Sequence, residues 1–202
     1  MNFTKFKFFL CVYLLLNAGS TVIAADLSPS QMIATSIELL DLKLGDEANK
    51  ERLGDNRVEL YNIIDQTLSP YFQKKYAGRL VLDKYWASTN KSQRERFTEG
   101  LYQSLIRSYS ISMLNFDVSK ISVKPIIANF QDLKKITVES NVDYKGEIIP
   151  MNFSFGKFKE GWRFYDVRIE GVSYIKNYRS QFKAEIQANG LDSVILRLES
   201  QK

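Results

Sequence analysis

Histidine is absent from this chain of 202 residues, and Cys11 is its one cysteine. Histidine is the side chain that most readily acts as a general base near neutral pH, and it is also the commonest metal ligand. Catalytic sites of the Ser-His-Asp and Cys-His types are therefore excluded. The acidic residues are scattered and form no arrangement typical of a metal or phosphate site. The commonest routes to enzymatic function are closed, although paired carboxylates stay possible, and we expect no cofactor.

A secretory signal peptide is indicated by residues 1–25. Lys5 and Lys7 form a basic start, residues 8–16 are apolar, and small residues precede the expected cleavage after Ala25. The apolar run is much shorter than the roughly 20 residues that span a bilayer, which favours cleavage over a retained anchor. Cys11 lies inside the apolar run, which disfavours a lipoprotein. We expect a mature protein in the periplasm.

The mature chain would have no cysteine, so no disulfide holds its fold although the periplasm permits disulfides. Its length suits a single domain over residues 26–202, mainly helical over 26–115 and with a sheet and C-terminal helices over 116–202. Loss of the two signal-peptide lysines lowers the formal net charge from +5 to +3. No long basic run indicates a nucleic-acid partner, and we expect a monomer.

The first half of the chain has apolar residues at helical spacing. Capping boxes predict helix starts at Ser28-Pro-Ser-Gln31 and at Asn90-x-x-Gln93. The polar segment 42–55 contains two glycines and predicts a loop or frayed helix ends. The expected helices begin at Ser28, Asn56, Ser69 and Asn90. Each has a stripe of apolar residues along one face, which in the same order are Ile33, Ile37, Leu40 and Leu44; Leu60, Ile64 and Leu68; Phe72, Tyr76 and Leu80; and Phe97, Leu101, Leu105, Tyr109 and Met113.

The second half has apolar residues that alternate with polar ones, which is typical of strands. Short turn signals at Lys145-Gly146 and at 159–161 separate some of these strands. Helices followed by strands predict an α+β fold with a four-stranded antiparallel meander. The four expected strands cover residues 119–127, 134–144, 147–158 and 162–169.

After the fourth expected strand the apolar and aromatic residues recur every four positions and no longer every two. Gly171 breaks the strand pattern where the chain must bend, and Gly190 is a fitting helix stop. A last helix is expected beyond it, with Asp192 as its N-cap. The first of these two helices has the stripe Tyr174, Tyr178, Phe182 and Ile186.

One face of the third predicted strand is large and apolar and faces the stripe of the long helix. Either an ordinary core or a cavity for an apolar ligand fits this pattern, since curved antiparallel sheets closed by helices often leave a cavity. Periodicity does not distinguish the two. The strand face comprises Ile149, Met151, Phe153 and Phe155, and the helix stripe comprises Leu105, Tyr109 and Met113.

Two sequence blocks together resemble the MlaC family, also called toluene-tolerance or ABC-transporter auxiliary proteins. The first is Trp-x-x-Tyr-Asp-Val-x-Ile-Glu-Gly-Val-Ser with Asn-Tyr-Arg-Ser-Gln-Phe, over residues 162–182. The second is Leu80-Val-Leu-Asp-Lys-Tyr-Trp86 followed by Gln93-Arg-Glu-Arg-Phe97. Asp83 stands where the family usually has glycine. The resemblance implies a cone like that of nuclear transport factor 2, closed around an apolar cavity, with a helical subdomain.

The resemblance also implies a periplasmic phospholipid shuttle that performs no chemistry and maintains outer-membrane lipid asymmetry. Its partners would be the substrate-binding subunit of an inner-membrane ABC transporter and an outer-membrane lipoprotein–porin complex. The candidate lipid-binding residues are Leu105, Tyr109, Met113, Ile149, Met151, Phe153, Val167, Ile169, Val172 and Tyr174, and the candidate docking residues are Lys74, Lys75, Arg79 and Lys84.

Two other function classes stay open from the sequence. One is an exported enzyme that uses a carboxylate such as Asp166 as its base, and the other is an adaptor that scaffolds a transporter without binding a ligand. For Asp166, Glu170 and Arg179 we expect a structural role, in which hydrogen bonds and an ion pair fix the strand, the bend and the following helix.

Overall fold

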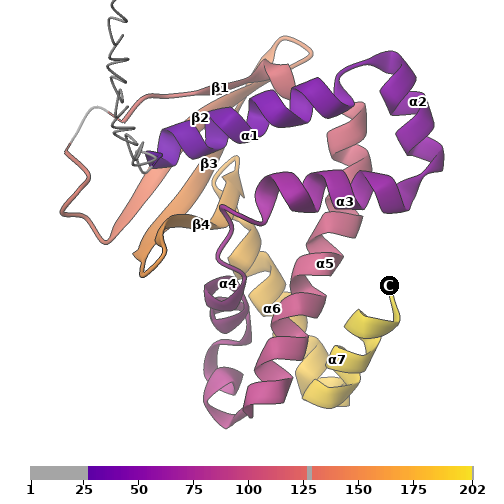
Figure 1. Cartoon of the computed structure of the whole chain (residues 1–202). Helices are drawn as coiled ribbons and strands as arrows, with labels where there is room; N and C mark the ends of the chain where they lie inside the picture. Colours follow the sequence, from indigo (N-terminus) through magenta and orange to yellow (C-terminus); the bar gives the residue numbers. More distant parts are fainter. Residues whose placement is uncertain (1–26, 127–128, 202) are drawn as a thin grey trace, which may run out of the picture.

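The computed structural model describes residues 27–126 and 129–201 as a mixed α+β structure (Figure 1). The predicted signal peptide, residues 1–25, lies outside the described residues. The helices are α1 (Pro29–Leu44), α2 (Glu47–Asp55), α3 (Arg57–Leu68), α4 (Lys74–Leu82), α5 (Lys91–Asn115), α6 (Tyr174–Asn189) and α7 (Leu191–Ser200), with short 3-10 helices η1 (Asp83–Ser88) and η2 (Val118–Lys120). The strands are β1 (Ile121–Val123), β2 (Lys135–Tyr144), β3 (Glu147–Phe158), β4 (Gly161–Ile169) and β5 (Val172–Ser173).

The sheet is antiparallel and follows chain order, as the meander prediction requires, but it has five strands and not four. The additional strand, β5, turns back on β4 so that Val172 pairs with Ile169. Glu170 and Gly171 connect them with φ values of 50° and 80°, and such positive values suit a two-residue hairpin turn. A strand of two residues is too short to produce a period-two pattern, which is why the sequence indicated only a bend.

The other turn predictions are confirmed by the backbone. Lys145 and Gly146 both have positive φ, 55° and 86°, between β2 and β3. Gly161 has a φ of 95° and begins β4. A strand register this long, with ten pairs from Lys135 to Tyr144, fixes which side chains of β3 face the helices.

The two capping boxes are present as predicted. The Ser28 hydroxyl accepts a hydrogen bond from the Gln31 backbone N–H at 3.3 Å, and the Gln31 side chain accepts one from the Ser28 N–H at 2.8 Å. Asn90 and Gln93 make the same reciprocal pair at the start of α5. Each box satisfies two backbone donors that a helix start otherwise leaves unpaired.

Two helix predictions are wrong in detail. Residues 42–55 do not form a loop, because they contain α2, whose Leu53 side chain is completely buried. One apolar anchor is sufficient for this helix, and one residue produces no periodic signal. Asp192 is not the N-cap of α7; Gly190 is. The Asp192 carboxylate lies in the first turn and accepts a hydrogen bond from the Gln93 side chain of α5 at 2.8 Å.

The helices form two groups that share α5. Figure 1 shows α1 running across the sheet and α4, α6 and α7 gathered around the first half of α5 at the other end. The second group has its own core, which includes Phe97, Phe182 and Val194. The linker 69–73 between α3 and α4 attaches to β4 through backbone hydrogen bonds of 2.8 and 2.9 Å with Phe164. Helices from both halves of the sequence therefore enclose the same space beside the sheet.

Candidate functional site

A cavity of about 690 Å³ lies between the sheet and helices α1, α3, α5 and α6. The cavity wall is almost entirely apolar, and it takes its side chains from segments that are far apart in the sequence. Helix α1 contributes Ile33, Ile37 and Leu40, and β3 and β4 contribute Met151, Phe153, Val167 and Ile169. Helix α5 contributes Leu101, Leu105, Tyr109 and Met113 of its predicted stripe, but not Phe97. An apolar hollow of this size is suited to a large apolar ligand.

The cavity reaches solvent near the C-terminal end of α5. Ser112 and Asn115 both line the cavity and are exposed. Tyr144, at the end of β2, also lines it and is 46% exposed, with its ring centroid 6.3 Å from that of Phe116. Polar residues therefore lie at the opening, while the rest of the wall is mostly apolar, an arrangement that suits an amphipathic ligand.

Eight of the ten predicted lipid-binding residues line this cavity. Ile149 and Val172 do not. Ile149 is half-buried beside Val142, its partner on β2, and Val172 is 60% exposed on the short edge strand β5. The eight are Leu105, Tyr109, Met113, Met151, Phe153, Val167, Ile169 and Tyr174. Whether they contact a lipid stays a prediction.

Several residues of the cavity wall were not predicted. The stripe of α1 is visible in the sequence, but only the tertiary structure shows that it covers the cavity. Phe72 was predicted on the stripe of a helix that begins at Ser69, but α4 begins at Lys74, so Phe72 lies in the linker between α3 and α4 and forms part of the wall. The wall residues without a prediction include Ile33, Ile37, Leu40, Leu68, Phe72, Val81, Tyr102 and Ile106.

Three tyrosines form a polar but uncharged part of the wall. The Tyr109 and Tyr178 hydroxyl oxygens are 3.4 Å apart, and the Tyr109 and Tyr174 ring centroids are 5.2 Å apart. Burial raises the pKa of Tyr109 above its ordinary value, and the hydrogen bond with Tyr178 raises it further. The Tyr109 hydroxyl is therefore held in its neutral form, which adds less desolvation cost to binding an apolar ligand than a charged group would.

Asp166 connects β4 to the start of α6. Its side chain is 5% exposed; Oδ2 accepts a hydrogen bond from the Ser173 hydroxyl at 2.7 Å and Oδ1 accepts one from the Ile175 N–H at 3.0 Å. The Ser173 oxygen in turn accepts from the Lys176 N–H at the N-terminus of α6. Both carboxylate oxygens are thus engaged in fixing the strand, the hairpin and the helix relative to each other.

Arg179 does not make the ion pair that was expected for it. Its Nε donates a hydrogen bond to the Leu80 backbone oxygen at 2.7 Å, which joins α6 to α4. The cation closest to the Asp166 carboxylate is Arg168, with 3.7 Å between Nε and Oδ2. The sequence block is therefore structural at both residues, but through different partners from those predicted.

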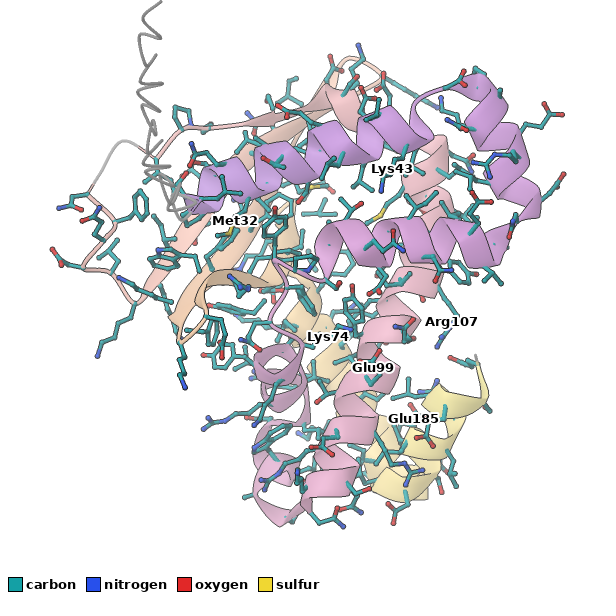
Figure 2. All side chains as sticks on the ribbon, viewed as in Figure 1. Met32, Lys43, Lys74, Glu99, Arg107 and Glu185 are labelled. Atoms are coloured by element: carbon teal, nitrogen blue, oxygen red, sulfur yellow. The ribbon has the colours of Figure 1, made fainter. Side chains whose placement is uncertain are left out.

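The four predicted docking residues do not share one environment. Lys75, Arg79 and Lys84 are exposed. Lys74 is less available for contact with a partner protein, because its ammonium lies 3.3 Å from a Glu99 carboxylate oxygen and 3.8 Å from the Tyr102 ring centroid. Figure 2 labels Lys74 and Glu99 between the sheet and the helical group. Lys74 therefore belongs to an internal contact between α4 and α5.

Metal binding and membrane insertion find no support in the described part of the chain. Residues 27–126 and 129–201 contain no cluster of three or more side chains of the kinds that hold a metal ion. None of the helices in the same ranges is both long enough and apolar enough to cross a bilayer.

Comparison with known families decides the assignment of the chain. The family model described as MlaC protein matches residues 46–200. The chain belongs to the MlaC family. The match covers both sequence blocks on which the resemblance rested, so that resemblance is confirmed.

Individual relatives agree with membership of the MlaC family. The chain is 28% identical over 182 residues to the toluene tolerance protein ttg2D of Pseudomonas putida, covering 88% of this chain and 82% of the relative. It is 25% identical over 158 residues to the intermembrane phospholipid transport system binding protein MlaC of Haemophilus influenzae, covering 76% and 73%.

A solved structure has the same fold. The phospholipid-binding protein from Ralstonia solanacearum, determined in complex with a phospholipid, superposes with a TM-score of 0.73 at 22% identity, covering 86% of this chain and 96% of the other. At that identity the match shows a shared fold and nothing beyond it.

Proposed function

We propose that this MlaC-family chain is a phospholipid carrier that encloses acyl chains in the 690 Å³ cavity and leaves the head group at the opening. The single observation that supports this most strongly is the size of a cavity with a mostly apolar wall, which has the exposed polar residues Ser112 and Asn115 at one end. The relatives named for phospholipid transport and the phospholipid-bound structure with the same fold point in the same direction.

The energetics explain why a carrier needs such an enclosure. Each buried CH₂ contributes roughly 0.8 kcal/mol, so two chains of about 16 carbons represent on the order of 25 kcal/mol of gross burial. Water cannot carry a molecule with that penalty, and a closed apolar wall offsets it. The same magnitude makes release slow unless a partner provides the chains with an apolar path. Because the head group stays outside, the carrier would tolerate different head groups.

The setting follows from the same proposal. The chain would be exported through a signal peptide at 1–25 and act in the periplasm as a monomer of one domain, 26–202, with the cone-like sheet described for nuclear transport factor 2. It would carry lipid between an outer-membrane lipoprotein–porin complex and the substrate-binding subunit of an inner-membrane ABC transporter. In this way it would maintain outer-membrane lipid asymmetry.

The other two function classes have weaker support. An enzyme that uses Asp166 as its base would need a free carboxylate oxygen, whereas both oxygens accept hydrogen bonds from the protein itself. An adaptor without a ligand would not need a cavity whose interior is apolar and whose opening is polar.

Organic extraction of the purified protein followed by mass spectrometry tests the proposal. We expect phospholipid in a stoichiometric amount, with mixed head groups. Protein that contains no lipid, and that takes up none from phospholipid vesicles, would refute the carrier and favour the adaptor. Exposure of the protein to a panel of ester substrates, with product detection, tests the enzyme class separately.

A further inference from the structure

A second hollow, of about 510 Å³, lies next to the apolar cavity. This polar cleft is bounded by the linker between α3 and α4, the start of α4, η1 and the first half of α5. Its walls are mostly charged or polar, in contrast to those of the cavity. The residues that line it are Ser69, Phe72, Gln73, Lys74, Lys75, Trp86, Arg94, Glu95, Thr98 and Glu99.

Phe72 is shared by the two hollows, since it lines both the apolar cavity and the polar cleft. Its ring stacks on Tyr102 with centroids 5.5 Å apart and an angle of 25°, and lies 5.0 Å from the Phe164 centroid. At this point the partition between the two spaces is therefore about one aromatic side chain thick. The backbone that carries Phe72 belongs to the short linker 69–73, outside any helix or long strand.

The partition is completed by Tyr102 and Lys74. Tyr102 is 3% exposed and lines the cavity, whereas Lys74 lines the cleft and holds its ammonium 3.8 Å from the Tyr102 ring centroid. Lys74 is also paired with Glu99, which belongs to the cleft. One face of Tyr102 therefore belongs to the apolar side and the other to the charged side, with the cation–π contact holding the two together.

We propose that Phe72 is a gate between the apolar cavity and the polar cleft, so that the cleft is a second exit of the lipid site. The proposal rests on the proposed carrier function. Phe72 acts as a positioning residue: it keeps acyl chains in the cavity while Lys74 holds Tyr102 behind it. The exit opens next to Lys75, one of the predicted docking residues, and Arg79 follows one turn later on α4. A partner bound there would reach the acyl chains without approaching the opening at Ser112.

The test measures lipid release from the full chain in the absence of partner proteins. The protein is loaded with a phosphatidylcholine that carries a pyrene-labelled acyl chain, and transfer to vesicles of unlabelled phosphatidylcholine is followed by fluorescence. We expect Phe72→Ala to release lipid about tenfold faster, which corresponds to a barrier lower by ~1.4 kcal/mol. Lys74→Met keeps the packing on Tyr102 but removes the cation, and we expect a smaller acceleration in the same direction.

Phe130→Ala is the matched control, because it removes the same kind of ring from a half-buried position beside Trp162 that lines neither the cavity nor the cleft. We expect less than about a threefold change in its release rate, since the barrier of the exit is unaltered. Thermal melting of each variant separates a local opening from a general loss of structure.

The gate is refuted if Phe72→Ala and Phe130→Ala change the release rate equally, or if neither changes it. If Phe72→Ala does not fold, Phe72→Trp takes its place: a larger ring should slow release by about threefold, and an unchanged rate refutes the gate. Failure of the gate is distinguishable from failure of the carrier function, because in the second case the unmodified protein takes up no pyrene-labelled lipid at all.

Discussion

Replacement of Asp166 by Asn tests the structural assignment of the most deeply buried carboxylate in the sequence block 162–182. Asn has the same shape, and its oxygen can still accept the hydrogen bond from the Ile175 N–H. In the unmodified protein Oδ2 accepts a hydrogen bond from the Ser173 hydroxyl, and the amide nitrogen of Asn that takes the place of Oδ2 cannot accept it. The substitution therefore removes the negative charge and one favourable acceptor while leaving the packing intact.

The expected loss of stability is about 2–3 kcal/mol. A hydrogen bond to a charged group contributes about 1 kcal/mol more than one to a neutral group, and two such bonds are affected at Asp166. The charge also lies at the N-terminus of α6, where a partly buried carboxylate contributes about 0.3–1 kcal/mol through the helix dipole. Arg168 adds little because it is 42% exposed at 3.7 Å. Asp166→Ala leaves both donors unpaired and should cost about 4 kcal/mol.

Urea unfolding with lipid occupancy measured by mass spectrometry is the assay for Asp166→Asn. We expect a lower midpoint with unchanged occupancy in the folded protein. Asp192→Asn is the matched control: Asp192 is also in the first turn of a helix and accepts a hydrogen bond, but it is exposed, so about 0.5 kcal/mol is expected. Equal midpoints for Asp166→Asn and the unmodified protein would refute the reasoning. A turnover reaction that Asp166→Asn abolishes in a normally folded protein would overturn the choice of a carrier over an enzyme.

Three further outcomes are expected. Phe153→Glu places a carboxylate in the apolar wall at a desolvation cost of several kcal/mol. The amount of lipid extracted from the variant should therefore fall sharply while circular dichroism still reports a folded protein. Full lipid occupancy in a folded variant would contradict the placement of the lipid. Reversing both Lys75 and Arg79 to Glu should slow transfer to partner proteins and flatten its salt dependence, because exposed charges steer encounter, while loaded lipid stays bound; unchanged rates and salt slopes would move the docking surface elsewhere. Burial raises the pKa of Tyr102, so the folded state favours the neutral form of its hydroxyl. The stability that this preference contributes is fully present below the pKa of about 10 that tyrosine has in the unfolded chain, and it is lost as the pH rises above that value. Guanidinium midpoints at pH 8 and about 10.5 should therefore differ less for Tyr102→Phe than for the unmodified protein, and an equal difference would contradict the assignment.

Much of the fold could be predicted from the sequence because the determinants are local. The capping boxes at Ser28 and Asn90 involve residues three apart, and the turn at Lys145-Gly146 depends on two backbone conformations. The meander and the stripe of α5 follow from periods of two and about four, which each element expresses by itself. Eight of the ten predicted lipid-binding residues line the cavity for the same reason: they lie on faces whose periodicity is unambiguous.

The tertiary structure alone decided the features that depend on contacts between distant segments. Whether the apolar faces meet in a filled core or enclose a hollow is a matter of how far apart α1, α5 and the sheet are held, and no periodic pattern contains that distance. Lys74 looked like a surface cation, but its neighbours Glu99 and Tyr102 come from another helix and convert it into an internal contact. Phe72 was predicted on a helical stripe, but it lies in the linker before α4, and only the approach of β4 and α5 places it between two hollows. Local interactions determine each element from its own residues, whereas cavities, partitions and the partners of buried charges arise from the spacing between elements, which packing sets.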